Sequence, residues 1–201
     1  MARLSEDLES SLMDMASIFD GNLFLLLSNA LLDFSRVRRR TLAGKVALIA
    51  GQVVYDCPAD FISFGVSYWG ASQRQSIKPW EPGYPQRTPR ARVMDSDNGK
   101  QLLFDAPPSA GQIASLGAEY AFTYYASHVI SEDGDKTTVS VSDRDLLLLR
   151  AQAEAMRFMA NRNIKKPVAS REAISGQTRN GTPAALYDFY LKQFNEMAAR
   201  C

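Results

Sequence analysis

The sequence predicts an α+β protein in which a helical bundle carries an inserted small antiparallel β-sandwich or open-barrel domain. Two observations lead to this fold class. Stretches with helical periodicity lie near both ends of the 201 residues, whereas the middle holds short alternating runs separated by turn residues. We expect residues 1–44 and 142–201 to form one discontinuous helical domain and residues 45–141 to form the inserted β domain.

The clearest helix is the stretch 146–162, with the sequence LLLLRAQAEAMRFMANR. Its residue types are mostly strong helix formers. Its apolar residues cover more than one face, which indicates packing partners on several sides. Ser142 or Asp143 is expected to cap the first turn, and Asp145 places negative charge near the positive end of the helix dipole.

Three further helices follow from apolar spacing and from capping residues. Residues 4–19 repeat apolar side chains at steps of three and four. Residues 23–36 are apolar nearly all round, so this helix should lie inside a helical layer or at a subunit contact. Residues 184–199 follow the cap pair Thr182-Pro183. A short helix is also expected at residues 170–175.

The middle of the chain predicts five to seven short strands, typical of a small antiparallel domain. Residues 61–69 alternate as a half-buried strand does, and Asn98-Gly99 supplies the turn of a hairpin. In the longest run, Tyr120, Phe122, Tyr124 and His128 are expected on one face. The strand ranges are 46–50, 52–55, 61–69, 91–94, 101–104, 119–130 and 137–141.

Two segments are candidate contact surfaces. The proline-rich loop 70–90 carries Trp80 and Tyr84, and we weigh equally an ordered contact with a partner and a loop folded over its own aromatics. The run Arg38-Arg39-Arg40 follows a predicted helix, and its commoner role is a cationic helix end followed by a solvated loop. The alternative is contact with phosphate or with an acidic partner.

Composition limits the function classes. The net charge of +1 does not drive the whole chain to nucleic acid or to a membrane. The run 23–34 is too short to cross a bilayer, and residues 1–20 lack the basic start of a secretory signal. The two cysteines, Cys57 and Cys201, have no metal-ligand or disulfide-framework spacing, so a reducing compartment is expected.

No residue pattern predicts an active site, a metal site or a cofactor site. His128 is the single histidine and lacks an accompanying nucleophile motif, so we interpret it as a packing residue. Asp95, Asp97 and Gly99 faintly echo a calcium loop, but no Glu stands at its twelfth position. We expect Cys57 to be buried and the protein not to be an enzyme.

Four strings in order carry a family resemblance. They are AGQVVYDCPADF at residues 50–61, LLFDAPP at 102–108, YAFTYYASH at 120–128 and LLLRAQAEAM at 147–156. In this order, and flanked by apolar helices, the chain resembles the head-to-tail connector proteins of tailed bacteriophages, also called adaptor or head-completion proteins. The resemblance covers nearly the whole chain, and its motifs are patterns of residue type and order.

The resemblance implies a structural virion protein. Such adaptors bind beneath the portal protein in the neck, usually as a dodecameric ring, extend the DNA channel and present a surface to stopper or tail-completion proteins. It therefore implies the portal, tail-side proteins, further copies of the chain and the packaged DNA as partners. It implies the virion neck as location, after assembly in the host cytoplasm, and it brings no membrane, cofactor or catalytic residue.

The candidate interface follows from this expectation. Adaptors often dock a C-terminal segment into the portal, and here the final helix itself is the candidate docking element. The candidate interface residues are Trp80, Tyr84, Arg38, Arg39, Arg40, Tyr187, Tyr190 and Phe194. We expect the helices 23–36 and 146–162 to supply apolar ring contacts. The alternative function is a carbohydrate- or nucleic-acid-binding module that uses the aromatic strand.

Overall fold

The computed structural model describes residues 4–19, 22–82, 84–85, 87–97, 99–131, 136–162, 164–173 and 176–200. In this part of the chain, helices accompany antiparallel sheets of three, three and two strands, and none of the sheets closes into a barrel. The predicted α+β class is confirmed. The β structure consists of small open sheets.

The chain forms two compact units, Met1–Arg39 with His128–Cys201 and Arg40–Ser127. We call them the helical unit and the β unit. These boundaries differ from the expected 1–44, 45–141 and 142–201. The first strand already begins at Arg40, and the strand that leads back ends at Ala126. His128 then lies against Phe34 in the helical unit, with their rings 5.1 Å apart.

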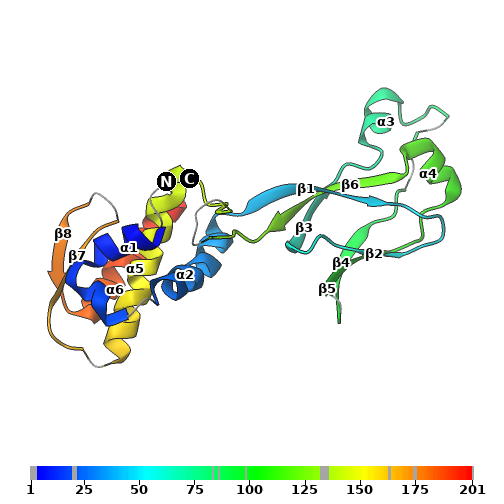
Figure 1. Ribbon diagram of the computed structural model, residues 1–201. Helices are drawn as coiled ribbons and strands as arrows, with labels where there is room; N and C mark the ends of the chain where they lie inside the picture. Colours follow the sequence, from blue (N-terminus) through cyan, green and yellow to red (C-terminus); the bar gives the residue numbers. More distant parts are fainter. Residues whose placement is uncertain are drawn as a thin grey trace. The chain divides into compact units, whose positions relative to one another are not determined.

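Helix α5 is the centre of the helical unit (Figure 1). It lies against α1, α2 and α6, and all of its side chains from Leu146 to Met156 are buried. The wide apolar face therefore has its partners within the unit, as expected from its pattern. The helical elements are α1 (Leu4–Leu12), α2 (Leu23–Val37), η2 (Val141–Asp143), α5 (Arg144–Asn161) and α6 (Pro183–Ala199).

The first helix is shorter than predicted. It ends at Leu12 because Met13 has a φ of 54°, which the α-helix does not allow. The chain continues as the 3-10 helix η1 (Met13–Phe19). The expected cap at α5 is also different, because Ser140 accepts a hydrogen bond from the Asp143 backbone N–H and caps η2 instead. At α6 the predicted cap is confirmed, since the Thr182 side chain accepts from the Ala185 N–H.

A hairpin replaces the short helix predicted at 170–175, of which 174 and 175 lie outside the described residues. Strands β7 (Val168–Arg171) and β8 (Thr178–Gly181) pair antiparallel. The hairpin is held from α5 by Gln152, whose side chain donates to the Arg171 carbonyl and accepts from the Ala173 N–H at 3.2 Å. These tertiary hydrogen bonds outweigh the weak local helix preference.

The β unit contains two three-stranded sheets. Their orders are β1-β6-β3 and β2-β5-β4. Every second residue of β6 is buried, from Tyr120 to Ala126, and Phe122 packs so closely on β1 that a Cβ on Gly44 would lie 2.7 Å from its ring. The elements are β1 (Arg40–Ala47), β2 (Val54–Asp56), β3 (Phe61–Ser67), α3 (Ala71–Ser76), β4 (Ala91–Ser96), β5 (Gly99–Phe104), α4 (Ala110–Leu116) and β6 (Glu119–Ala126).

Several strand predictions need correction. The first strand covers Arg40–Ala47 where 46–50 was expected, and the strand predicted at 137–141 does not form because that segment leads into η2. The 91–94 and 101–104 hairpin is confirmed, with Ser96 opposite Gly99, while Asn98 lies outside the described residues. Because β6 ends at Ala126, His128 does not share the aromatic face of the strand.

Candidate functional site: a groove between two helices

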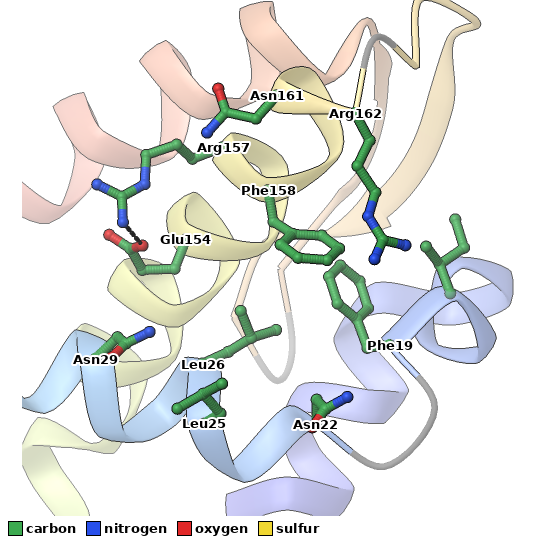
Figure 2. Close-up of a pocket in the computed structure, with 11 residues that line it drawn as sticks. Phe19, Asn22, Leu25, Leu26, Asn29, Glu154, Arg157, Phe158, Asn161 and Arg162 are labelled. Atoms are coloured by element: carbon green, nitrogen blue, oxygen red, sulfur yellow. Dashed lines mark ion pairs between the residues drawn. The ribbon is translucent and has the colours of Figure 1, made fainter.

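A groove of about 380 Å³ lies in the helical unit between α2 and the C-terminal half of α5. Figure 2 shows the side chains that surround it. We call it the α2–α5 groove. Its lining residues are Ile18, Phe19, Asn22, Leu25, Leu26, Asn29, Glu154, Arg157, Phe158, Asn161 and Arg162.

Helical periodicity places these side chains. Asn22, Leu25, Leu26 and Asn29 stand at positions i, i+3, i+4 and i+7, which fall on one face of a helix. The α5 residues 154, 157, 158 and 161 repeat the same spacing. Two such faces on neighbouring helices form the walls of a groove, and η1 closes one end with Ile18 and Phe19.

The floor of the groove is apolar. Phe19 and Phe158 lie with ring centroids 5.5 Å apart, and Leu26 beside them is buried. Leu25 is 57% exposed at the mouth, although it is a large apolar residue. An apolar segment that covered this floor would remove these side chains from water, which is the main favourable term in association.

The rim is polar and positively charged. The Arg162 guanidinium lies 4.3 Å from the centroid of the Phe158 ring, a cation–π contact that holds the charge at the edge of the floor. Arg157 lies 2.5 Å from the buried carboxylate of Glu154. Three asparagine side chains complete the rim. The groove thus suits an apolar anchor that carries a carboxylate.

Buried charges connect the two walls. Arg150 contacts Asp33 of α2 at 2.7 Å and Glu154 of its own helix at 2.5 Å. Burial alone would lower the pKa of Arg150, but the hydrogen bonds that it donates to Asp33 and the charge of Glu154 outweigh burial and raise this pKa. Arg150 therefore stays charged, and an ionic contact joins the two walls.

The apolar surface continues along α2. Leu32 is 66% exposed and stands seven residues after Leu25, on the same side of the helix. The expectation that the helix 23–36 offers contact surface therefore has an exposed stripe to support it. For 146–162 the expectation is wrong for Leu146–Met156, which is buried within the unit, whereas Phe158 and Arg162 line the groove.

The aromatic loop residues differ from one another in exposure. Trp80 is 78% exposed, with the Lys78 ammonium 5.6 Å from its ring centroid. Tyr84 is half-buried and lines a hollow of about 530 Å³ between the loop and α4, together with Ser109 and Gln112. The loop also contains helix α3, which the prolines did not predict. Tyr84 is thus packed against its own unit, and Trp80 projects into solvent.

The arginine run does not form one cationic patch. Arg38 points into the helical unit, where its Nε lies 3.3 Å from Asp143 and its Nη1 donates to the Ala198 carbonyl at 3.2 Å. Its predicted role as a contact for DNA or an acidic partner is therefore wrong. Arg40 lies 3.5 Å from Asp60 in the β unit, and Arg39 is exposed.

The final helix turns its aromatic face inward. Tyr190 is 0% exposed and Phe194 is 3% exposed, so neither can be part of an interface without unfolding the helix, and their prediction as docking residues is wrong. The Tyr190 hydroxyl is hydrogen-bonded to Ser170 of β7, and burial raises the Tyr190 pKa. Tyr187 is half-buried at the edge of the same core.

His128 and Cys57, the candidate reactive residues, are packed against neighbouring groups. His128 Nε2 lies 3.0 Å from the Arg38 carbonyl oxygen and Nδ1 lies 3.2 Å from the Thr138 hydroxyl, so both ring nitrogens have partners. Burial raises the pKa of the half-buried Cys57 thiol. Among the described residues, no three His, Cys, Asp or Glu side chains gather as metal ligands would.

The aromatic strand is part of a core. Tyr120, Phe122 and Tyr124 are buried. Tyr124 stacks on Phe61, Phe122 stacks on Phe64, and Tyr120 meets Phe104 edge to face. Their faces are covered by other rings, so they do not form the open platform that stacking on bases or sugars requires. The alternative function, a carbohydrate- or nucleic-acid-binding module, depended on these side chains being exposed, and they are buried.

Neither the comparison with protein-family models nor that with curated proteins yields a match. Within the described residues, no helix combines the length and the apolar content needed to cross a membrane.

The groove is the feature that sequence reasoning missed. Its spacing signal was present in both helices, but the sequence does not tell which face of α2 lies against α5.

Proposed function

We propose that this chain is a structural head-to-tail adaptor of a tailed bacteriophage, which forms a ring beneath the portal and joins it to the tail side. The observation that carries the proposal is the open α2–α5 groove, with the exposed Leu25 at its mouth. A chain that works alone gains nothing from such exposed apolar side chains, whereas a ring subunit covers them.

The sequence strings at 50–61, 102–108, 120–128 and 147–156 give the proposal its family. In the structure all four strings contribute to the two cores, and the string 50–61 does so through Tyr55 and Phe61. The string 147–156 lies within α5, and the strings 102–108 and 120–128 supply β5 and β6 with buried residues such as Leu102 and Phe122. The resemblance to adaptors therefore concerns residues that build the two cores.

Charge is compatible with a DNA channel. A net charge of +1 gives weak attraction to phosphate, and each additional phosphate contact would strengthen binding and slow passage. Arg39 is exposed and is the residue of the run that we retain as a candidate for the channel surface. Reversal of its charge should alter DNA retention in the virion.

Co-sedimentation with the portal tests the proposal. The chain is mixed with the portal protein encoded in the same genome, and the mixture is separated on a density gradient. We expect the chain to move with the portal at one copy per portal subunit, and to remain at the top of the gradient without it. Portal particles that sediment without the chain, at micromolar concentrations of both, would contradict the proposal.

A further inference from the structure

We propose that the α2–α5 groove receives the Trp80–Glu81 turn of a second copy of this chain, so that copies join head to tail. The inference rests on the proposed function in one respect: a ring requires a contact that repeats from each copy to the next. The inference adds that the two surfaces in this contact are the α2–α5 groove and the Trp80–Glu81 turn.

The donor is an exposed and ordered turn. Trp80 has the largest exposed fraction, 78%, among the exposed large apolar side chains of the described residues. The Glu81 carboxylate accepts a hydrogen bond from the Lys78 N–H at 3.1 Å, and the Glu81 N–H donates to the Lys78 carbonyl at 2.9 Å. The Glu81 side chain and the backbone of the turn are thus held before binding, which lowers the entropic cost of association.

The receptor is complementary in shape and charge. The indole needs an apolar cavity, and the groove offers about 380 Å³ over Phe19, Leu26 and Phe158. The carboxylate beside the indole needs a cation, and Arg162 stands at the rim. Tryptophan and arginine are the residue types most enriched among those that dominate interface energies.

A second copy is the occupant because the chain carries both halves of the contact. Two different surfaces that fit each other generate head-to-tail assembly, which closes into a ring when the rotation permits. A contact of groove against groove would bring the Arg162 charges of both copies into one interface without the Glu81 carboxylate, and like charges oppose association. A contact of turn with groove pairs Glu81 with Arg162 instead.

Photo-crosslinking tests the contact directly. A donor chain carries p-benzoylphenylalanine in place of Trp80 and is mixed with an isotope-labelled acceptor chain, both in full length, over a range of concentrations up to about 100 µM, where micromolar affinities saturate. After irradiation, mass spectrometry finds the crosslinked residues. We expect adducts between copies at Leu25, Leu26 or Phe158. Adducts only within one copy, adducts elsewhere, or none at all would overturn the inference.

Matched acceptor variants show whether the groove itself is used. Leu25→Arg changes an exposed residue that lines the groove, and Leu32→Arg changes an equally exposed residue of the same helix outside it. We expect Leu25→Arg to reduce the adducts at least about tenfold, as loss of a central contact does. Leu32→Arg should change them less than about twofold, as expected for a residue outside the contact. Equal effects of both would overturn the inference.

Charge reversal tests the pairing of Glu81 with Arg162. Arg162→Glu in the acceptor should lower the adduct yield, and Glu81→Arg in the donor should restore it, whereas a purely structural effect of either change would add to the other. Thermal unfolding of each variant shows that it is folded. Failure of the reversed pair to restore crosslinking would remove the charge contact from the proposal.

The outcome separates this inference from the proposed function. If Leu25→Arg and unchanged chains bind the portal equally and the photo-adducts are absent, the adaptor function stands and the groove contact fails. If adducts form in the groove but the chain does not co-sediment with the portal, the head-to-tail contact stands and the adaptor function fails.

Discussion

Arg150 on α5 donates two hydrogen bonds to one carboxylate oxygen of Asp33 on α2, from Nε at 3.0 Å and from Nη2 at 2.7 Å. Nη2 also lies 2.5 Å from Glu154, whose other oxygen contacts Arg157. The buried guanidinium therefore joins the two walls of the α2–α5 groove. This contact adds to the apolar packing of Leu26, Leu27 and Phe34 in the same core.

Arg150→Met should lower the free energy of unfolding by about 3–5 kcal/mol, because it leaves the buried Glu154 carboxylate without its main counter-charge. The double variant Arg150→Met with Glu154→Leu removes both charges and should be destabilised by at most about 1–2 kcal/mol. Urea unfolding followed by circular dichroism measures both. A double variant as unstable as the single one would show that packing, and not the unpaired charge, governs this site.

Tyr190→Phe should destabilise the helical unit by about 1–3 kcal/mol, since it leaves the buried Ser170 hydroxyl without its partner. Adding Ser170→Ala removes the unpaired hydroxyl, so the double variant should lose less than the sum of the single losses. Thermal unfolding of the unchanged chain, the two single variants and the double variant completes the double-mutant cycle. Additive losses would mean that the two hydroxyl groups do not interact.

Cys57 should react slowly with iodoacetamide at pH 8. Its thiol is half-buried and its pKa is raised, first by burial, so the reactive thiolate is scarcer than in a free cysteine. Mass spectrometry of peptides that contain Cys57 measures the rate in the folded chain and in urea. Equal rates in both states would contradict the burial of this side chain.

Asp105→Asn should reduce the stability of the β unit at pH 7 and have no effect near pH 2. The Asp105 carboxylate accepts a hydrogen bond from the Arg90 N–H at 2.8 Å, and this bond is the main reason for its lowered pKa. Because the folded pKa lies below the ordinary 3.8, its stabilisation is complete above that pH and is lost as the pH falls through the folded pKa.

Melting temperatures of the two chains at pH 7, 5, 3 and 2 test this dependence. The melting curves should be read from tryptophan fluorescence, since Trp69 and Trp80 both lie in the β unit and Trp69 is buried there. The difference between unchanged and Asp105→Asn chains should be constant from pH 7 to 5 and should shrink below. A difference in melting temperature that persists at pH 2 would mean that the carboxylate charge does not cause the loss of stability.

Local sequence signals correctly predicted those helix caps, turns and strands whose tertiary surroundings agree with the conformational preference of their own residues. The cap at Thr182, the hairpin that ends at Ser96 and Gly99, and the alternation of β6 were confirmed, since each depends on neighbours in the chain. The helix expected to run through Met13 and the helix expected at Ser170 were wrong. The second position is decided by tertiary contacts, those of Gln152 and Tyr190 with the β7 strand.

The candidate site was predictable in part. The exposure of Trp80 agrees with its expected place on a contact loop, but the burial of Tyr190 could not be read from an apolar helix face, which looks the same inside a core and at an interface. Arg38 looked like a surface cation. Its partners Asp143 and Ala198 are more than a hundred residues away, and only folding brings them to it.

Electron microscopy of the chain mixed with the portal protein is the measurement that tests the central claim most directly. The adaptor account predicts class averages in which a second ring of density lies beneath the portal ring, coaxial with its channel. The proposed groove contact adds that this ring is missing when the chain carries Trp80→Ala and is retained with Tyr68→Ala, a change at another exposed aromatic residue of the β unit. Bare portal rings, in mixtures where the unchanged chain is folded and in excess, would contradict the account.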